Sequence, residues 1–286
     1  MSRSQSTRGA VVAVTGGAHG IGRAIACRFA AAGAHVAIGD TDLAAAQEVA
    51  DQPGLHAYGL DVTDTGSFTD FLDAVRRDLG PVDVLVSNAG LMWVGSFDEE
   101  PESAARAQLS VNLLGVINGI KAAAPAMRRA GHGHLITVAS AASLLPTPGE
   151  ATYAATKHGV LGYLKAVRME LRGSGVEVTA VMPAVVDTTL AAGTGTGSAP
   201  LLQPTDVARA VVAAADRPRF EVTVPAYIGP LTRMVNLLPQ AMRDRLFGTM
   251  VPDQVTEVRA EARAGYEGSF TTSRPARPAA GSAAAE

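Results

Sequence analysis

Residues 10–40, AVVAVTGGAHGIGRAIACRFAAAGAHVAIGD, contain an apolar run, a glycine-rich loop, a helix-like segment and a second apolar run. The runs at 10–15 and 34–39 have the length and composition of buried strands. The segment from Arg23 to Ala32 is rich in alanine and is typical of a helix. This order predicts a strand, a helix and a second, parallel strand packed as one βαβ unit.

The same alternation continues to about residue 225. Further strand-like runs, separated by segments with the Ala, Leu, Arg and Glu content of helices, stand at 54–60, 82–87, 134–140, 176–182 and 221–225. No Pro-, Gly- or Ser-rich linker divides this region, so it predicts one domain. The expected fold is α/β: a single-domain, Rossmann-type doubly wound sheet of about seven mostly parallel strands, with helices on both faces.

The composition limits the kinds of partner. Of the 286 residues, 47% are apolar and 18% are charged, and the net charge is -3 with no basic run. Nucleic-acid binding usually leaves a basic stripe, so no nucleic-acid partner is expected. The single cysteine, Cys27, forms no internal disulfide, and no Cys/His cluster has zinc-ligand spacing, so no metal is expected. The N-terminus has no apolar h-region, and no apolar run reaches roughly 18 residues, so we expect a cytoplasmic protein without a transmembrane segment.

The chain outside the core is less regular. Residues 193–204, GTGTGSAPLLQP, are typical of a mobile loop, and two short amphipathic helices broken at Pro239 are expected beyond residue 225. Three roles are open for this apolar stretch: packing on the core or a partner subunit, a lid over a lipophilic substrate, or contact with a membrane surface. The expected segments are an N-terminal arm at 1–9, the core domain at 10–225 with a lid loop at 190–204, an apolar helical extension at 226–272 and a disordered tail at 273–286.

The glycine loop has the form of a phosphate site. Gly16, Gly20 and Gly22 directly follow the first strand and open a helix. Glycines let the backbone approach a pyrophosphate closely, and the helix N-terminus presents free N–H groups and a positive dipole. Asp40, at the end of the second strand, can bind both ribose hydroxyls of an adenosine. Because Thr41 rather than a basic residue follows it, we expect NAD as the preferred cofactor, with NADP as the alternative.

A second group of residues has the chemistry of proton transfer. Ser140 ends the fifth strand-like run, and Tyr153 and Lys157 stand four residues apart in a helix-like segment, so they share one face. When hydride leaves an alcohol carbon the hydroxyl proton must leave too, and a tyrosine phenolate can accept it. A neighbouring ammonium group, together with the charge of an oxidised nicotinamide, lowers the pKa of the tyrosine. The serine hydroxyl can orient the substrate oxygen.

These motifs resemble the short-chain dehydrogenase/reductase (SDR) family over roughly residues 8–225, on the TGxxxGxG loop at 15–22, the Asn88-Ala89-Gly90 turn and the YAATK segment at 153–157. The resemblance implies that Asn112, Ser140, Tyr153 and Lys157 are catalytic, with Asn112 as the anchor of a water-mediated proton relay to Lys157. A satisfied buried amide is the alternative role for Asn112. The cofactor-binding residues that the resemblance implies are Thr15, Gly16, Gly20, Ile21, Gly22, Asp40, Asp61, Val62, Asn88, Ala89, Gly90, Tyr153, Lys157, Pro183, Val186 and Thr188.

One segment departs from the family pattern. Where the family has P-G-x-V-x-T, this chain keeps Pro183 and Thr188 but has Ala184 in place of the glycine. Alanine allows fewer backbone conformations than glycine, so the sequence does not decide the conformation of this nicotinamide loop. The expected substrate pocket includes Ser140, Leu190 and Trp93, although an ordinary packed aromatic is an equal alternative for Trp93.

The expected function is that of an NAD(P)-dependent oxidoreductase, an alcohol dehydrogenase or carbonyl reductase that interconverts a secondary or lipophilic alcohol and its ketone or aldehyde. The first alternative is an NADPH-dependent ketoreductase with the same catalytic residues. The second is a dinucleotide-binding regulator without catalysis, which the presence of all four catalytic residues disfavours. The expected partner is a small apolar alcohol or carbonyl substrate. The resemblance also implies a homodimer or homotetramer built on two long helices around 103–130 and 151–172.

Overall fold

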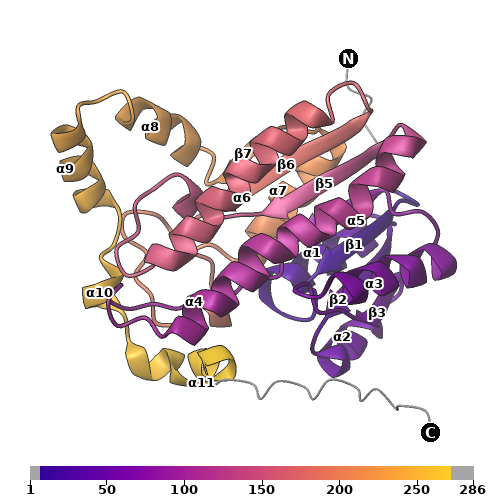
Figure 1. Ribbon diagram of the computed structural model, residues 1–286, viewed down its shortest axis with the longest axis horizontal. Coiled ribbons are helices and arrows are strands. Elements are labelled where there is room, and N and C mark those ends of the chain that lie inside the picture. The colour runs from indigo at the N-terminus through magenta and orange to yellow at the C-terminus, as the bar shows by residue number, and fades with distance from the viewer. Residues whose placement is uncertain (1–6, 272–286) are drawn as a thin grey trace, which may run out of the picture.

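Seven parallel strands form the centre of the protein, whose computed structural model describes residues 7–271 (Figure 1). The order across the sheet is β3-β2-β1-β4-β5-β6-β7, and every neighbouring pair is parallel. The chain winds outward from β1 in one direction and then, from β4, in the other. The expected doubly wound α/β fold is therefore confirmed. The strands are β1 (Val11–Thr15), β2 (His35–Asp40), β3 (Leu55–Gly59), β4 (Val84–Ser87), β5 (Gly133–Val138), β6 (Val176–Pro183) and β7 (Glu221–Val224).

Helices cover both faces of the sheet, because the side chains of a strand point alternately to either side. On β1, Val12 and Val14 pack in one apolar cluster with helices α1 (Gly20–Ala31), α2 (Leu43–Ala50) and α7 (Pro204–Asp216). Val11 and Ala13 pack in the other with α3 (Thr65–Asp78), α5 (Gly115–Ala130) and α6 (Ala151–Glu170). Strands that are buried on both faces consist of continuous apolar runs, which is why the sequence predicts them.

The long helix expected around 103–130 has three consecutive segments: α4 (Glu102–Gln108), a π-helical stretch η1 (Leu109–Leu114) and α5. The sequence does not predict η1, in which Asn112 lies. Among the described residues, the run Glu102–Ala130 is the one helix with the length and apolar composition of a membrane span. The core helix of a soluble protein passes the same test, and α5 packs on β4 and β5, so this evidence for a membrane is weak.

After β7 the chain forms α8 (Ile228–Val235), α9 (Gln240–Met250), α10 (Gln254–Glu257) and α11 (Ala260–Thr271). The break at Pro239 is where the sequence predicts it. Figure 1 shows α8 and α9 to one side of the sheet, while the chain returns so that α11 contacts α4. Much of the apolar surface of α8, α9 and the turn between them faces solvent: Met234 of α8 is 68% exposed, Leu237 of the turn 86% and Met242 of α9 53%. The expected tail at 273–286 and most of the arm at 1–9 lie outside the described residues.

Candidate active site

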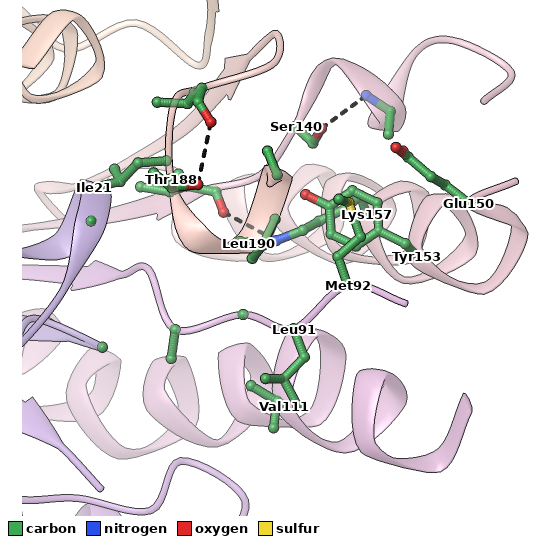
Figure 2. Close-up of a pocket in the computed structure, with 18 of the residues that line it drawn as sticks. Ile21, Leu91, Met92, Val111, Ser140, Glu150, Tyr153, Lys157, Thr188 and Leu190 are labelled. Atoms are coloured by element: carbon green, nitrogen blue, oxygen red, sulfur yellow. Dashed lines mark hydrogen bonds between the residues drawn. The ribbon is translucent and has the colours of Figure 1, made fainter. Parts of the chain in front are cut away.

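A cavity of about 1740 Å³ crosses the carboxyl ends of the strands, where the winding direction reverses between β1 and β4. Open α/β sheets bind their ligands at this point. Asp40 lines the cavity at one end and Tyr153 lines it at the other. In Figure 2, Ile21 and Thr188 stand on one side, and Tyr153 and Glu150 stand on the other.

The conformation of the glycine loop lets a ligand approach the protein backbone closely. Gly16 and Gly20 have left-handed φ angles of +64° and +49°. A Cβ atom on Gly22 would lie 2.0 Å from the carbonyl oxygen of Gly16, so only glycine fits there. The side-chain amide of Asn88 donates to the carbonyl oxygens of Thr15 (3.1 Å) and Gly16 (3.0 Å) and fixes the loop. No side chain caps the N-terminus of α1, so its first N–H groups are free for an anion. This arrangement fits the pyrophosphate of a dinucleotide.

Asp40 is held in position at the adenosine end. One carboxylate oxygen accepts a hydrogen bond from the backbone N–H of Ala18 (3.0 Å), and the other accepts one from Asp42 N–H (3.1 Å). Asp42 caps α2 and pairs with His19 at 3.4 Å. His19, which also lines this end of the cavity, is therefore paired with a second carboxylate. The surroundings of Asp40 are acidic, which suits ribose hydroxyls better than a ribose phosphate.

The nicotinamide loop accommodates Ala184. Among residues 7–271, only glycines have positive φ angles, so Ala184 adopts an ordinary backbone conformation. Its N–H donates to the carbonyl oxygen of Val224 (2.8 Å), which continues the pairing of β6 with β7. The Thr188 hydroxyl donates to the carbonyl oxygen of Val186 (3.3 Å). The substitution therefore causes no backbone strain at this position.

Ser140, Tyr153 and Lys157 line the same end of the cavity (Figure 2). The structure corrects the position of Ser140: β5 ends at Val138, and Ser140 caps the short 3-10 helix η2 (Ala141–Ser143), with its hydroxyl oxygen accepting from Ala142 N–H (3.1 Å). A cap requires extended backbone at the serine, so from sequence it is indistinguishable from the end of a strand. The Lys157 ammonium donates to the carbonyl oxygen of Val138 (3.4 Å) and lies 5.4 Å from the centre of the Tyr153 ring.

Burial controls the protonation of this group. Desolvation and the nearby Glu150 carboxylate raise the pKa of Tyr153 well above its usual value, and a hydrogen bond with Ser140 opposes them. Desolvation also lowers the pKa of Lys157 to about 8. The sequence predicts that Lys157 lowers the pKa of Tyr153. Within the chain itself, the pKa of Tyr153 is raised instead. The phenol is held in its protonated form.

Asn112 is fully buried and its amide is satisfied. Its side-chain oxygen accepts from Leu91 N–H (2.7 Å), and its nitrogen donates to the Leu91 carbonyl oxygen (2.8 Å) and the Thr156 hydroxyl (3.1 Å). A Cβ atom on Gly90 would lie 3.4 Å from the Asn112 oxygen and 3.7 Å from the Lys157 nitrogen. Asn112 therefore ties the strand-end loop to α6 close to Lys157, and η1 sets its position.

Helix α11 lines the cavity through Tyr266, Ser269 and Phe270 and contacts α4, a feature that sequence reasoning missed. We refer to residues 250–271 as the roof. Arg263 is 1% exposed, and its guanidinium pairs with Glu267 (2.6 Å). It also donates to the carbonyl oxygens of Leu190 (2.9 Å), Ala192 (3.0 Å) and Met92 (2.7 Å). One side chain thus joins the roof, the lid loop and the loop after β4.

Further contacts complete the roof. Tyr266 and Phe270, which pack edge to face at 5.2 Å, both line the cavity. The Gln254 amide donates to the Gly195 carbonyl oxygen and accepts from Gly195 N–H, both at 2.8 Å. The i, i+4 spacing of Tyr266 with Phe270 and of Arg263 with Glu267 is a helical signal that was available in the sequence.

Most of the expected site residues meet at this one cavity. Four do not line it: Asn112, described above; Thr15 and Gly22, the first and last residues of the glycine loop; and Trp93, whose ring covers Gly95. Those that do are Gly16, Gly20, Ile21, Asp40, Asp61, Val62, Asn88, Ala89, Gly90, Ser140, Tyr153, Lys157, Pro183, Val186, Thr188 and Leu190.

Comparison with known proteins finds relatives among oxidoreductases. Residues 10–198 match the model of the short chain dehydrogenase family. Over 228 residues the chain is 34% identical to "Glycine betaine reductase ATRR" of Emericella nidulans, covering 73% of this chain but only 18% of that protein. Over 191 residues it is 36% identical to "2,5-dichloro-2,5-cyclohexadiene-1,4-diol dehydrogenase LinX" of Sphingobium indicum, covering 64% of this chain and 76% of the relative.

Solved structures resemble the fold over most of its length. A short chain dehydrogenase/reductase from Burkholderia phymatum in complex with NAD superposes with a TM-score of 0.76 at 25% identity, covering 82% of this chain and 95% of that one. A 3-ketoacyl-(acyl-carrier-protein) reductase from Brucella melitensis, complexed with NADH, superposes with a TM-score of 0.70 at 28% identity, covering 76% and 98%. Both neighbours hold a nicotinamide dinucleotide.

Proposed function

Because the chain belongs to the short chain dehydrogenase family of nicotinamide-dependent oxidoreductases, we propose that it interconverts an apolar secondary or lipophilic alcohol and its ketone or aldehyde. The observation that carries the proposal is the meeting of Ser140, Tyr153 and Lys157 at one end of a cavity whose other end is the glycine loop and Asp40. The residues that line this cavity fit a dinucleotide, and such a cofactor would supply the hydride donor or acceptor.

Residues of the chain itself carry out the proton transfer. Tyr153 donates its hydroxyl proton to the substrate oxygen as a carbonyl is reduced, and it takes that proton back as an alcohol is oxidised. The Ser140 hydroxyl orients the substrate oxygen. The Lys157 ammonium lies beside the Tyr153 ring and can return a proton to the phenolate once Tyr153 has given its own proton to the substrate. Since burial holds Tyr153 protonated, the acid form required for reduction is the populated one near neutral pH. Oxidation should need a higher pH.

We also propose NAD as the preferred cofactor. Asp40 is fixed by two backbone N–H groups at the adenosine end, and His19 is engaged with Asp42. A carboxylate in this position hydrogen-bonds ribose hydroxyls and repels a phosphate on the ribose.

The substrate end of the cavity supports an apolar substrate. Its lining includes Met92, Leu145, Leu190 and the rings of Tyr266 and Phe270. Burial of such side chains against a ligand favours apolar molecules, while the few polar groups set the orientation.

A screen of alcohols and ketones with NAD(H) and NADP(H), followed by the absorbance of the reduced nicotinamide, tests the proposal. We expect turnover of apolar substrates by the natural chain and none by Tyr153→Phe. A chain that binds NAD but turns over no alcohol or carbonyl compound contradicts the proposed function.

A further inference from the structure

Glu150 is a carboxylate inside the substrate end of the cavity that the proposed mechanism does not use. It precedes α6 and stands three residues before Tyr153, and it is only 8% exposed. Figure 2 shows it among the residues that line the cavity, with Ser140 and Tyr153. A carboxylate at a helix N-cap normally accepts a hydrogen bond from the first turn. The side chain of Glu150 makes no such bond and faces the cavity instead.

This carboxylate has no counter-charge of its own. In residues 7–271 no ion pair includes Glu150, and the cation that faces it, Arg263, is already bound to Glu267 and to three carbonyl oxygens. Burial raises the pKa of Glu150 to about 7, which Arg263 and Thr147 oppose. A buried carboxyl group without an ion pair is costly to folding, so its presence in a ligand cavity points to a binding role.

The other charged and titratable groups near Glu150 are also engaged. On the α4 side, Glu100 is hydrogen-bonded to Thr152 and Gln108. On the roof, the Tyr266 hydroxyl accepts from Met92 N–H. The Thr147 hydroxyl is the polar group beside Glu150 and supplies no charge, so a charged or further hydrogen-bonding partner for the carboxylate has to come from the bound molecule.

We propose that Glu150 is a specificity-determining residue that accepts a hydrogen bond from a second polar group on the substrate, a hydroxyl or an ammonium, a few bonds from the reacting carbon. This inference rests on the proposed function, because Tyr153 has to hold the reacting oxygen. Glu150 directly precedes α6, Tyr153 lies in the first turn of that helix, and both side chains line the cavity, so they face neighbouring positions of one small molecule. The preferred class is therefore an apolar alcohol with a vicinal hydroxyl or amine, or the corresponding ketone.

The test compares cyclohexanol, vicinal cyclohexanediol and vicinal aminocyclohexanol as substrates of the natural chain and of Glu150→Gln. The amide keeps the volume of the side chain and removes its charge. Glu170→Gln, an exposed position at the far end of α6, is the matched control. We expect kcat/KM of Glu150→Gln to fall by about 10- to 100-fold for the two substrates with a second donor, the effect of a lost hydrogen bond to a charged group. Cyclohexanol should change little. A fall for only the diol or only the amine supports the proposal and identifies the donor.

An equal change for all three substrates overturns it. If the pH profile of kcat shifts together with that equal change, Glu150 acts through Tyr153 as a positioning residue instead. Binding is a second measurement that does not need turnover: thermal shifts of the NAD-loaded chain should be larger with the amino alcohol than with cyclohexanol, and the difference should vanish in Glu150→Gln. Equal shifts contradict the inference. Absent turnover with this difference preserved contradicts only the proposed function.

Discussion

Replacing Arg263 by alanine should release the roof while leaving the cofactor end of the cavity intact. The guanidinium pairs with Glu267 and donates to three carbonyl oxygens, all within 3.0 Å, from a site that is 1% exposed. Breaking a buried ion pair by removing one partner costs about 3–5 kcal/mol. If the roof stayed closed, the whole cost would fall on the folded chain.

The roof can open instead, because its helix is terminal and water can then solvate the released carbonyl groups. The free-energy cost of losing the ion pair then appears as a smaller fraction of molecules with the roof closed. About 3 kcal/mol corresponds to more than a hundredfold, and solvation reduces this, so we expect KM for apolar substrates to rise by about 10- to 100-fold. The affinity for NAD should change by less than about threefold, because the glycine loop contacts none of these groups.

Steady-state kinetics, NAD titration and hydrogen exchange of residues 260–271 measure the three effects in one variant. Arg245→Ala, an exposed arginine on α9, is the control. Rapid exchange across α11 together with raised KM agrees with the reasoning. Unchanged KM with unchanged protection of α11 refutes it, as does a loss of NAD affinity that parallels the loss of substrate affinity.

Three further predictions follow from single groups. Tyr153→Phe should abolish turnover with NAD affinity nearly unchanged, whereas Lys157→Ala should lose turnover and NAD affinity together. Calorimetric titration of both variants with NAD measures the affinity. An unchanged NAD affinity in Lys157→Ala would refute the contact between Lys157 and the cofactor. The ratio of kcat/KM should favour NAD over NADP, and equal values would count against Asp40 as the selector. Burial lowers the pKa of His134 from 6.5 to about 4, so the unfolded chain binds more protons between these values and the free energy of unfolding falls by up to about 3 kcal/mol as pH drops through them. Urea titrations between about pH 4 and 6.5 should show that slope, which should be absent above pH 6.5, and His134→Gln should reduce it.

The parts of the fold that local patterns control could be predicted from the sequence. Strands buried on both faces have a composition that only a parallel sheet explains, and the runs at 10–15 and 34–39 coincide with β1 and β2 to within one residue. The glycine spacing predicts the tight approach of Gly22 to Gly16, because no residue with a side chain fits there. The YAATK spacing places Tyr153 and Lys157 on one helix face for the same local reason.

The rest depends on contacts between residues that are distant in sequence. Arg263 bonds to Met92, 171 positions earlier, and no local pattern predicts that partner. The sequence analysis does not single out Glu150, because its burial arises only when segments that are distant in sequence pack around the cavity, among them the one that carries Arg263. Trp93 was offered as a pocket residue, but the cavity lining includes Met92 and not Trp93, since the loop is turned by its bonds to Asn112 and Tyr266.

The paired hydrogen bonds between Gln254 and Gly195 make the lid loop and the roof one mechanical unit. The amide of Gln254 meets both the N–H and the C=O of one peptide, as a neighbouring strand would, so neither segment moves without the other. We therefore expect substrate entry and product exit to require the lid loop and the roof to open together. A fluorescent label on the exposed face of α11 would therefore report on lid motion that takes place at residues 193–198, far away along the chain.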